Sequence, residues 1–288
     1  KMKRIFLEDI LTENVTITGD DAHHLAYSLR AQKGDKIVAV DLLGNSATLE
    51  LVDFDKDKIF AKCISKIKKV KSVEKIKIIR TICSSDKVET HFETVEKIFA
   101  KQITLAECLP KQNKFNYIVE KATELGVEKI CPLISDRTIA RPDISRANAK
   151  HERWFKIAKE TAEQSARDTL PEIENIVELV DWLKEIEPTL GHFIESDGKK
   201  IFDCKGALLL FCYEGEQEQK IQDILQEFKN ADCDKNIIVL IGPEGGFSDS
   251  EVEKIKSVGG VSVSLGKRIL KTDTAAISAL AVVQYELS

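Results

Sequence analysis

Glycine and proline punctuate the C-terminal segment 237–281, where the chain could bind a small molecule. The run Ile237-Ile-Val-Leu-Ile-Gly-Pro-Glu-Gly-Gly-Phe-Ser-Asp-Ser-Glu251 is typical of a buried strand, a tight turn and a helix, with Ser248 and Glu251 at capping-box spacing. Glycines from Gly242 to Gly246 would let backbone N–H and C=O groups approach a ligand, and would leave room for a flat group such as a purine. A merely tight strand-to-helix turn is the alternative, because the spacing matches neither GxGxxG nor a P-loop.

A second loop of the same kind follows one helix later. A short strand ends at Leu265-Gly266, and the chain then passes through residues 268–271. An apolar helix is expected over 275–285, with Thr272 and Asp273 as its candidate N-caps. In α/β sheets, ligands bind outside the carboxyl ends of the strands. Two glycine loops at neighbouring strand ends therefore favour a ligand crevice more than either loop does alone.

The elements that must position these loops form an alternating pattern from residue 103 onward. Continuous apolar strands alternating with helices predict a parallel sheet covered on both faces, that is, an α/β domain. The expected strands are 103–109, 130–134, 206–213 and 237–242, and the expected helices are 115–125, 145–167 and 217–228.

The first 70 residues predict a small, mostly β domain. Apolar runs at 36–42, 47–52 and 58–64 are separated by turn residues, and an acidic start followed by Leu25 and Leu29 favours a short helix over 20–30. At 288 residues the chain is long enough for two cores. We expect an N-terminal domain over 1–70, a lysine-rich connection of unknown role over 71–102, and the α/β domain over 103–288.

Composition narrows the class of protein. The chain is 43% hydrophobic and 32% charged, and it lacks the roughly 20-residue apolar run that a membrane helix needs. No secretory signal pattern is recognised near residue 1, so a cytoplasmic protein that binds no membrane is expected. The seven cysteines show neither CxxC pairs nor zinc spacing, which predicts reduced, mostly buried thiols and no metal.

Positive charge is concentrated between Phe54 and Thr90, although the net charge of the chain is −5. That segment holds eleven lysines and arginines against five acids. Such clustering indicates a polyanionic partner, because bound cations release counterions from phosphates. A lysine-rich strand edge that prevents aggregation would produce the same composition.

The two glycine loops resemble the C-terminal signature of the RsmE-type methyltransferases of 16S ribosomal RNA, of the SPOUT class. The similarity extends upstream through most of the chain, and His23-His-Leu, Leu29-Arg30 and Gly34-Asp35 resemble that family's PUA-like RNA-binding domain. The upstream blocks are Leu109-Pro-Lys111, Lys121-Ala-Thr-Glu-Leu-Gly-Val127, Pro132-Leu with Arg137, Arg153-Trp154, and Glu160 through Arg167 with Pro171.

The resemblance implies a homodimeric α/β-knot enzyme that transfers a methyl group from S-adenosyl-L-methionine (SAM) to N3 of a uridine in 16S rRNA. Carried over residue by residue, the SAM-binding residues would be Tyr213, Glu214, Gly215, Ile241, Gly242, Pro243, Glu244, Gly245, Gly246, Leu265, Gly266, Ile269, Leu270 and Thr272.

The sequence departs from the family pattern in three places. Lys271 and Asp273 stand where the family usually has arginine and glutamate, and lysine lacks the planar guanidinium fork that bidentate contacts need. The stretch 71–102 is longer than the usual connection between the two domains.

Catalysis at N3 needs a proton acceptor or a cation, because the uridine must lose a proton around the time of attack. Arg268 is the first candidate for the cation, with Arg137 as a second, and Glu163 or Glu244 could accept the proton. For each arginine, including Arg141 and Arg167, an RNA phosphate contact or a surface ion pair is the alternative. The expected RNA-binding residues are His24, Arg30, Lys33, Arg141 and Arg167.

Two other function classes fit parts of the sequence. A non-catalytic RNA-binding protein could keep the fold without methyl transfer, and it would not bind SAM. An enzyme that holds a nucleotide phosphate in the glycine loops is disfavoured, because no Lys-Ser/Thr pair follows the glycines.

Overall fold

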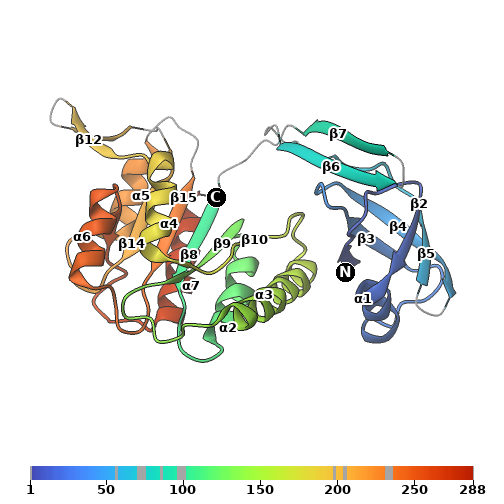
Figure 1. Ribbon diagram of the computed structural model, residues 1–288, viewed down its shortest axis with the longest axis horizontal. Coiled ribbons are helices and arrows are strands. Elements are labelled where there is room, and N and C mark those ends of the chain that lie inside the picture. The colour runs from blue at the N-terminus through green and yellow to red at the C-terminus, as the bar shows by residue number, and fades with distance from the viewer. Residues whose placement is uncertain are drawn as a thin grey trace. The chain divides into compact units, whose positions relative to one another are not determined.

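The computed structural model describes residues 2–55, 58–69, 76–84, 87–95, 102–196, 199–203, 206–230 and 236–287 (Figure 1). The chain divides into two compact units, Lys1–Phe99 with Ala166–Thr169 and Ala100–Ser165 with Leu170–Ser288. This division falls inside the connection expected over 71–102.

The N-terminal unit contains a five-stranded sheet in the order β1-β3-β4-β5-β2. The strands predicted near 36–42, 47–52 and 58–64 are all present, and alternate residues of β4 turn into the core. The pairing of β1 with β3 is parallel, and the other pairings are antiparallel. The strand bounds are β1 Lys3–Phe6, β2 Asn14–Thr18, β3 Lys36–Val40, β4 Ser46–Asp55 and β5 Lys58–Cys63.

The helix predicted over 20–30 is shorter and changes type along its length. An α-helical turn, α1 Gly19–His23, continues into a π-helical turn, His24–Ser28. Leu25 is completely buried and Leu29 packs against the core of this unit, as their spacing predicted. The wider π turn is a local geometry that apolar periodicity does not report.

A β-hairpin lies within the stretch expected to be a connection. Strand β6 (Ile76–Ser84) pairs antiparallel with β7 (Lys87–Val95). The side chains from 70 to 101, including five of the eleven lysines and arginines counted above, lie outside the described residues. The proposed role of those lysines therefore stays a prediction.

The C-terminal unit contains a seven-stranded sheet in the order β10-β9-β8-β15-β14-β16, with β11 also paired to β9. Every pairing in it is parallel, as the continuous apolar strands predicted. The bounds are β8 Ile103–Cys108, β9 Lys129–Ile134, β10 Glu172–Ile173, β11 Val177–Glu178, β14 Leu208–Cys212, β15 Ile237–Ile241 and β16 Val261–Val263.

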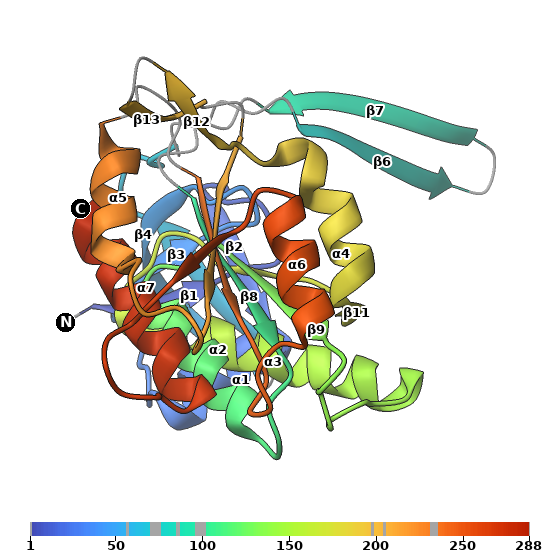
Figure 2. The ribbon, with the colours of Figure 1, turned by 90° about the vertical axis from the view of Figure 1, so that its left-hand side faces the viewer.

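Helices cover both faces of this sheet (Figure 2). Leu208 and Leu210 of β14 pack on the face shared with α2, α3, α5 and α7, whereas Leu209 and Phe211 pack on the face shared with α4 and α6. Both faces are therefore apolar, which explains why the strands do not alternate polar and apolar residues. The bounds are α2 Lys114–Glu124, α3 Ile144–Ser165, α4 Leu179–Ile186, α5 Ile221–Lys229, α6 Asp249–Ser257 and α7 Thr272–Leu287.

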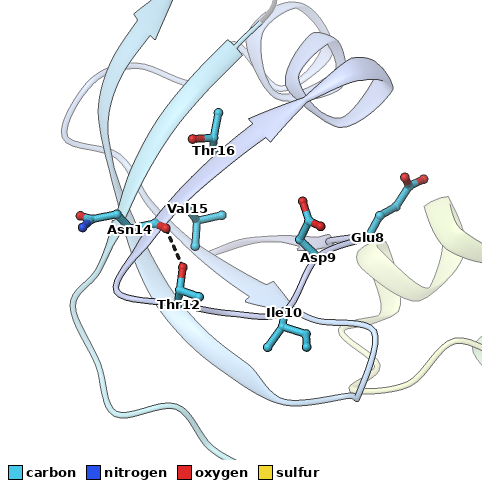
Figure 3. A pocket seen from close by; sticks show the side chains of 7 residues that line it. All are labelled: Glu8, Asp9, Ile10, Thr12, Asn14, Val15 and Thr16. Atoms are coloured by element: carbon cyan, nitrogen blue, oxygen red, sulfur yellow. Dashed lines mark hydrogen bonds between the residues drawn. The ribbon is translucent and has the colours of Figure 1, made fainter. Parts of the chain in front are cut away.

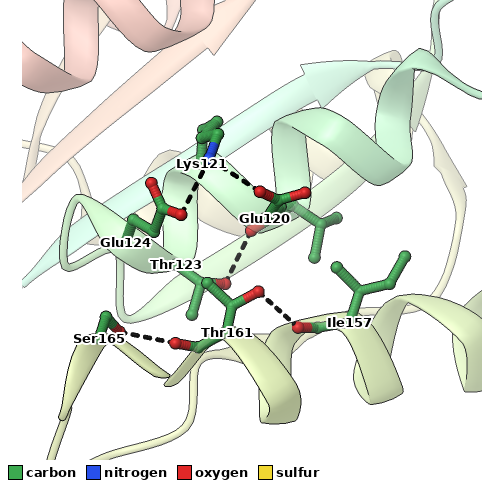
Figure 4. A network of polar contacts seen from close by, with 8 residues as sticks. Glu120, Lys121, Thr123, Glu124, Ile157, Thr161 and Ser165 are labelled. Carbon is green, nitrogen blue, oxygen red and sulfur yellow. Dashed lines mark hydrogen bonds and ion pairs between the residues drawn. The ribbon is translucent and has the colours of Figure 1, made fainter. Parts of the chain in front are cut away.

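Helices α2 and α3 pack against each other around Trp154, which is 1% exposed. Its ring centroid is 4.4 Å from that of Phe115, and its indole N–H donates to Asn116 Oδ1 at 3.1 Å. On the surface of α2, Lys121 pairs with Glu120 at 2.8 Å and with Glu124 at 2.9 Å (Figure 4). Exposed pairs of this kind contribute about 0–1 kcal/mol, so buried aromatic packing is the main stabilising contact.

Sequence periodicity did not predict α4 or the hairpin of β12 (Phe193–Ser196) and β13 (Lys199–Phe202). Helix α4 has only 8 residues, which is too short for a repeating apolar pattern to stand out. Burial of Trp182 and Leu183 against the sheet fixes it in place.

Candidate functional site

The carboxyl ends of the central strands meet at one edge of the C-terminal sheet. Ile241, the last residue of β15, is in register with Cys212 of β14 and with Glu107 of β8. Cys212 is in turn paired with Val263, the last residue of β16. Because all these strands are parallel, the loops that follow them emerge at the same edge.

The first glycine loop, residues 242–248, makes a tight turn closed by a hydrogen bond from Gly246 N to Pro243 O at 2.9 Å. Gly246 has φ +68°, and a Cβ there would lie 3.0 Å from Glu214 Oε1. A side chain at Gly246 would therefore be strained by both conformation and space. The loop leads into α6, whose predicted capping box between Ser248 and Glu251 is present.

A polar network holds the first glycine loop against the segment that follows β9. The buried Glu251 carboxylate accepts hydrogen bonds from Ser248 N and from Asp136 N, both at 2.8 Å. The Ser248 hydroxyl donates to Asp136 Oδ2 at 2.7 Å. Next along the chain, Arg137 Nη1 donates to Gly245 O at 2.9 Å. The sequence predicted the cap but not its second function, which is to tie two loops together.

The second glycine loop, residues 264–271, returns from β16 across the ends of β14 and β15 to begin α7. Gly266 has φ +119°, and a Cβ added there would have nothing within 4 Å, so conformation and not crowding favours glycine. Helix α7 begins at Thr272, three residues before the expected start at Ala275. The Thr272 hydroxyl lies 2.8 Å from Gly242 O, and this contact joins the two glycine loops.

A third segment follows β14 and is organised by Glu216. Its carboxylate accepts from the Ser262 hydroxyl at 2.6 Å and from Glu218 N and Gln219 N at 3.1 Å. The Ser262 hydrogen bond is the largest of the effects that lower the pKa of Glu216. The sequence did not mark this residue, because no local spacing connects it with Ser262.

The three segments enclose a cavity of about 1110 Å³. Most residues expected to bind SAM line it, whereas Gly215 and Gly245 do not: Gly215 lies against the Tyr213 ring and Gly245 against Arg137. The expected SAM-binding residues that line it are Tyr213, Glu214, Ile241, Gly242, Pro243, Glu244, Gly246, Leu265, Gly266, Ile269, Leu270 and Thr272. Polar residues that the sequence did not single out also line it: Glu216, Gln217, Lys220, Gln222, Ser264, Lys267 and Ser278. Lys271, one of the departures from the family pattern, lines it as well.

The candidate catalytic residues differ in their positions. Arg268 is exposed on the second glycine loop and lines the cavity. Arg137 lies outside the cavity and contacts Gly245 O, and Glu163 of α3 is not among the lining residues. Glu244 lines the cavity, but its carboxylate accepts from Lys111 N at 3.0 and 3.2 Å and lies 3.5 Å from Lys114 Nζ. These contacts leave Glu244 less suited to accept a proton from substrate.

The expected RNA-binding residues belong to both units. In the N-terminal unit Arg30 and Lys33 are exposed, and Lys33 lies 4.0 Å from Asp53 in an exposed pair. His24 is half-buried in the π-helical turn. Arg167 belongs to the segment 166–169 of the same unit and bonds Thr169 at 3.3 Å. In the C-terminal unit, Arg141 pairs with Glu178 at 3.1 Å.

A smaller cavity of about 400 Å³ lies in the N-terminal unit (Figure 3). Its lining includes the carboxylates of Glu8 and Asp9 and no cationic side chain. Thr12 Oγ1 donates to Asn14 O at 2.6 Å across its wall. Like charges would repel a phosphate here, so this cavity does not add to the RNA-binding candidates.

Within the described part of the chain, no cluster of three or more His, Cys, Asp or Glu side chains could hold a metal ion. In the same residues, no helix combines the length and apolar character needed to cross a membrane.

Known protein families match residues in both units of the chain. A family model described as an RNA methyltransferase domain matches residues 97–284, and one described as an RNA methyltransferase PUA domain matches residues 17–63. The ribosomal RNA small subunit methyltransferase E of Bacillus subtilis (strain 168) is 28% identical, over 99% of this chain and 97% of its own. That of Rickettsia conorii is 34% identical, over 67% of this chain and 68% of its own.

Solved structures support the same fold. A ribosomal RNA small subunit methyltransferase E from Neisseria gonorrhoeae, crystallised with S-adenosyl methionine, matches with a TM-score of 0.72 at 25% identity, over 99% of this chain and 98% of that one. The fold class expected from the sequence, an α/β-knot domain preceded by a small PUA-like β domain, is confirmed. The chain therefore belongs to the RNA methyltransferase family, and the relatives it resembles within that family are the ribosomal RNA small subunit methyltransferases E.

Proposed function

We propose that the protein transfers a methyl group from SAM to N3 of a uridine in the 16S RNA of the small ribosomal subunit. The observation that carries the proposal is the cavity between the two glycine loops, in a chain whose family acts on RNA. The names of its relatives support a small-subunit rRNA target, and the SAM-bound relative supports the cofactor.

The cavity suits SAM in chemistry as well as in size. Ile241, Val263 and Leu265 provide apolar surface for an adenine ring, and the open backbone at Gly266 provides polar groups beside it. Gln217 and Lys220, near the start of α5, could bind the ribose hydroxyls or the carboxylate. SAM would supply an electrophilic methyl group on its sulfonium.

Arg268 is the residue we propose to stabilise the uridine as N3 loses its proton. It lines the cavity, and among the described residues its guanidinium forms no ion pair. An available cation at the cavity mouth can stabilise negative charge that develops in the transition state. The geometry favours Arg268 over Arg137, which bonds to Gly245 O, and over Glu163, which does not line the cavity.

Our proposals for the quaternary structure and the cellular location rest on the family resemblance. We propose a homodimer, and the exposed side chains of Ile144 on α3 and Tyr285 on α7 offer apolar surface to a second copy. A ribosomal substrate agrees with the cytoplasmic location expected from the sequence.

Binding of SAM is tested first, by calorimetric titration of the full chain. We expect saturable binding, weakened by Gly266→Ala because alanine is strained at φ +119° and would disturb the second glycine loop. Gly19→Ala is the matched control, since Gly19 also has a positive φ of +63° with nothing within 4 Å, but lies in the N-terminal unit. An absence of binding would instead favour a non-catalytic RNA-binding protein.

The RNA target is tested by mass mapping of small-subunit rRNA from cells that lack this protein. We expect one N3-methyluridine to disappear and to return when the wild-type chain is supplied. Persistence of every N3-methyluridine in 16S RNA would contradict the proposed target, even if SAM binding is intact.

A further inference from the structure

Glu107 is a completely buried carboxyl group, and the proposed methyl transfer does not use it. It lies near the end of β8, beside Ile241 of β15 and the first turn of α7. Its Oε1 atom is 3.0 Å from Thr272 Oγ1, and its Oε2 atom has no hydrogen-bond partner. In the described part of the chain no cation pairs with it.

The groups around Glu107 do not favour a negative charge there. Asp273 of α7 and Glu244 of the first glycine loop both act on it as like charges. Lys114 of α2 is 3.5 Å from Glu244 and 3.9 Å from Asp273, so its charge is shared by those two carboxylates. The neighbouring thiols, Cys108 of β8 and Cys212 of β14, are neutral because burial raises the pKa of each.

The Thr272 hydroxyl makes two short contacts with oxygen atoms, and the available protons decide which of them are hydrogen bonds. The hydroxyl lies 2.8 Å from Gly242 O and 3.0 Å from Glu107 Oε1, but it carries a single proton. A carbonyl oxygen can only accept, so the hydroxyl must donate to Gly242 if that contact is a hydrogen bond. The remaining contact is then favourable only if Glu107 carries a proton and donates it to Thr272.

We propose that Glu107 is a positioning residue that stays protonated at neutral pH, donates to Thr272 Oγ1, and thereby directs the Thr272 hydroxyl to Gly242 O so that the two glycine loops are held together. This arrangement satisfies both short contacts with the two protons available. An ionised Glu107 would attract the Thr272 proton and leave Gly242 O facing an oxygen lone pair.

Burial supports the neutral form. Removal of the carboxyl group from water is the largest effect and raises the pKa of Glu107 well above its ordinary value. The contact with the Thr272 hydroxyl lowers the pKa but is outweighed, and the like charges of Asp273 and Glu244 raise it further. Oε2 has no hydrogen-bond donor, and burying such an oxygen costs less free energy in a neutral carboxyl group than in an ionised one. The contacts and the electrostatics therefore favour the same protonation state.

The first test measures stability against pH and does not depend on SAM. Glu107→Gln keeps the shape and a donor but cannot ionise. Above about pH 4.3 the unfolded wild-type chain loses this proton while the folded chain keeps it, so folded wild type loses stability relative to the glutamine variant as pH rises. We expect the melting temperature of Glu107→Gln minus that of wild type to increase from pH 4 towards pH 9. A constant difference would overturn the proposal.

The second test links Glu107 to the cavity, and this link rests on the proposed function. At pH 7 we expect Glu107→Gln to bind SAM within about twofold of wild type, whereas Glu107→Leu and Thr272→Val each weaken binding about tenfold because a buried polar group loses its partner. Equal losses in Glu107→Gln and Glu107→Leu would overturn the positioning role. If wild type binds no SAM, the proposed function fails, and the melting experiment still decides the protonation of Glu107.

Discussion

Arg137 donates a hydrogen bond from Nη1 to the backbone carbonyl of Gly245 at 2.9 Å, across 108 positions of sequence. A Cβ at Gly245 would lie 3.1 Å from Arg137 Cβ, so glycine allows this close approach. The contact fixes the outer side of the first glycine loop, whose inner side faces the cavity. We therefore predict that Arg137 shapes the cavity through this hydrogen bond.

Arg137→Ala is expected to weaken SAM binding about tenfold and to change kcat little once SAM is saturating, because the carbonyl of Gly245 loses its donor. Arg137→Lys, which keeps one donor, should recover part of the affinity. Calorimetry and steady-state kinetics measure the two effects. Arg146→Ala is the control, because Arg146 is an exposed arginine of α3 that pairs with Asp143. A large fall in kcat with normal SAM affinity would instead make Arg137 catalytic.

Arg268→Ala is expected to lower kcat about 100-fold or more, with SAM affinity little changed, because the variant removes charge that the transition state needs and the ground state does not. Lys267→Ala is the matched control, since Lys267 is its exposed neighbour and also lines the cavity. Single-turnover methylation of small subunits with saturating SAM gives the comparison. Near-normal kcat for Arg268→Ala would show the catalytic assignment to be wrong.

Replacing both Arg30 and Lys33 by alanine is expected to weaken RNA binding and to reduce the slope of log K against log salt by about one to two. Both side chains are exposed, so stability should change little. Filter binding or anisotropy across a salt series measures the slope. Lys184→Ala serves as the control, because Lys184 is exposed and paired with Asp181 on α4. An unchanged slope would remove these two residues from the RNA contacts.

Local signals in the sequence determined the elements that carry the site. Ser248 and Glu251 are three residues apart, and the capping box they predicted is present. Apolar runs predicted β14 and β15, and their continuous burial followed from a sheet covered on both faces. These predictions succeed because caps and apolar periods depend on neighbours within one or two turns of chain.

The tertiary structure alone decided how those elements combine into a cavity. Strand β14 lies between β15 and β16, so the loops that follow all three strands converge, and no local pattern reports that order. Glu107 and Thr272 are 165 positions apart, and only the packing of the fold brings their side chains within 3.0 Å of each other. A hydrogen bond of this kind depends on burial and distance, which the types of the two residues leave undetermined.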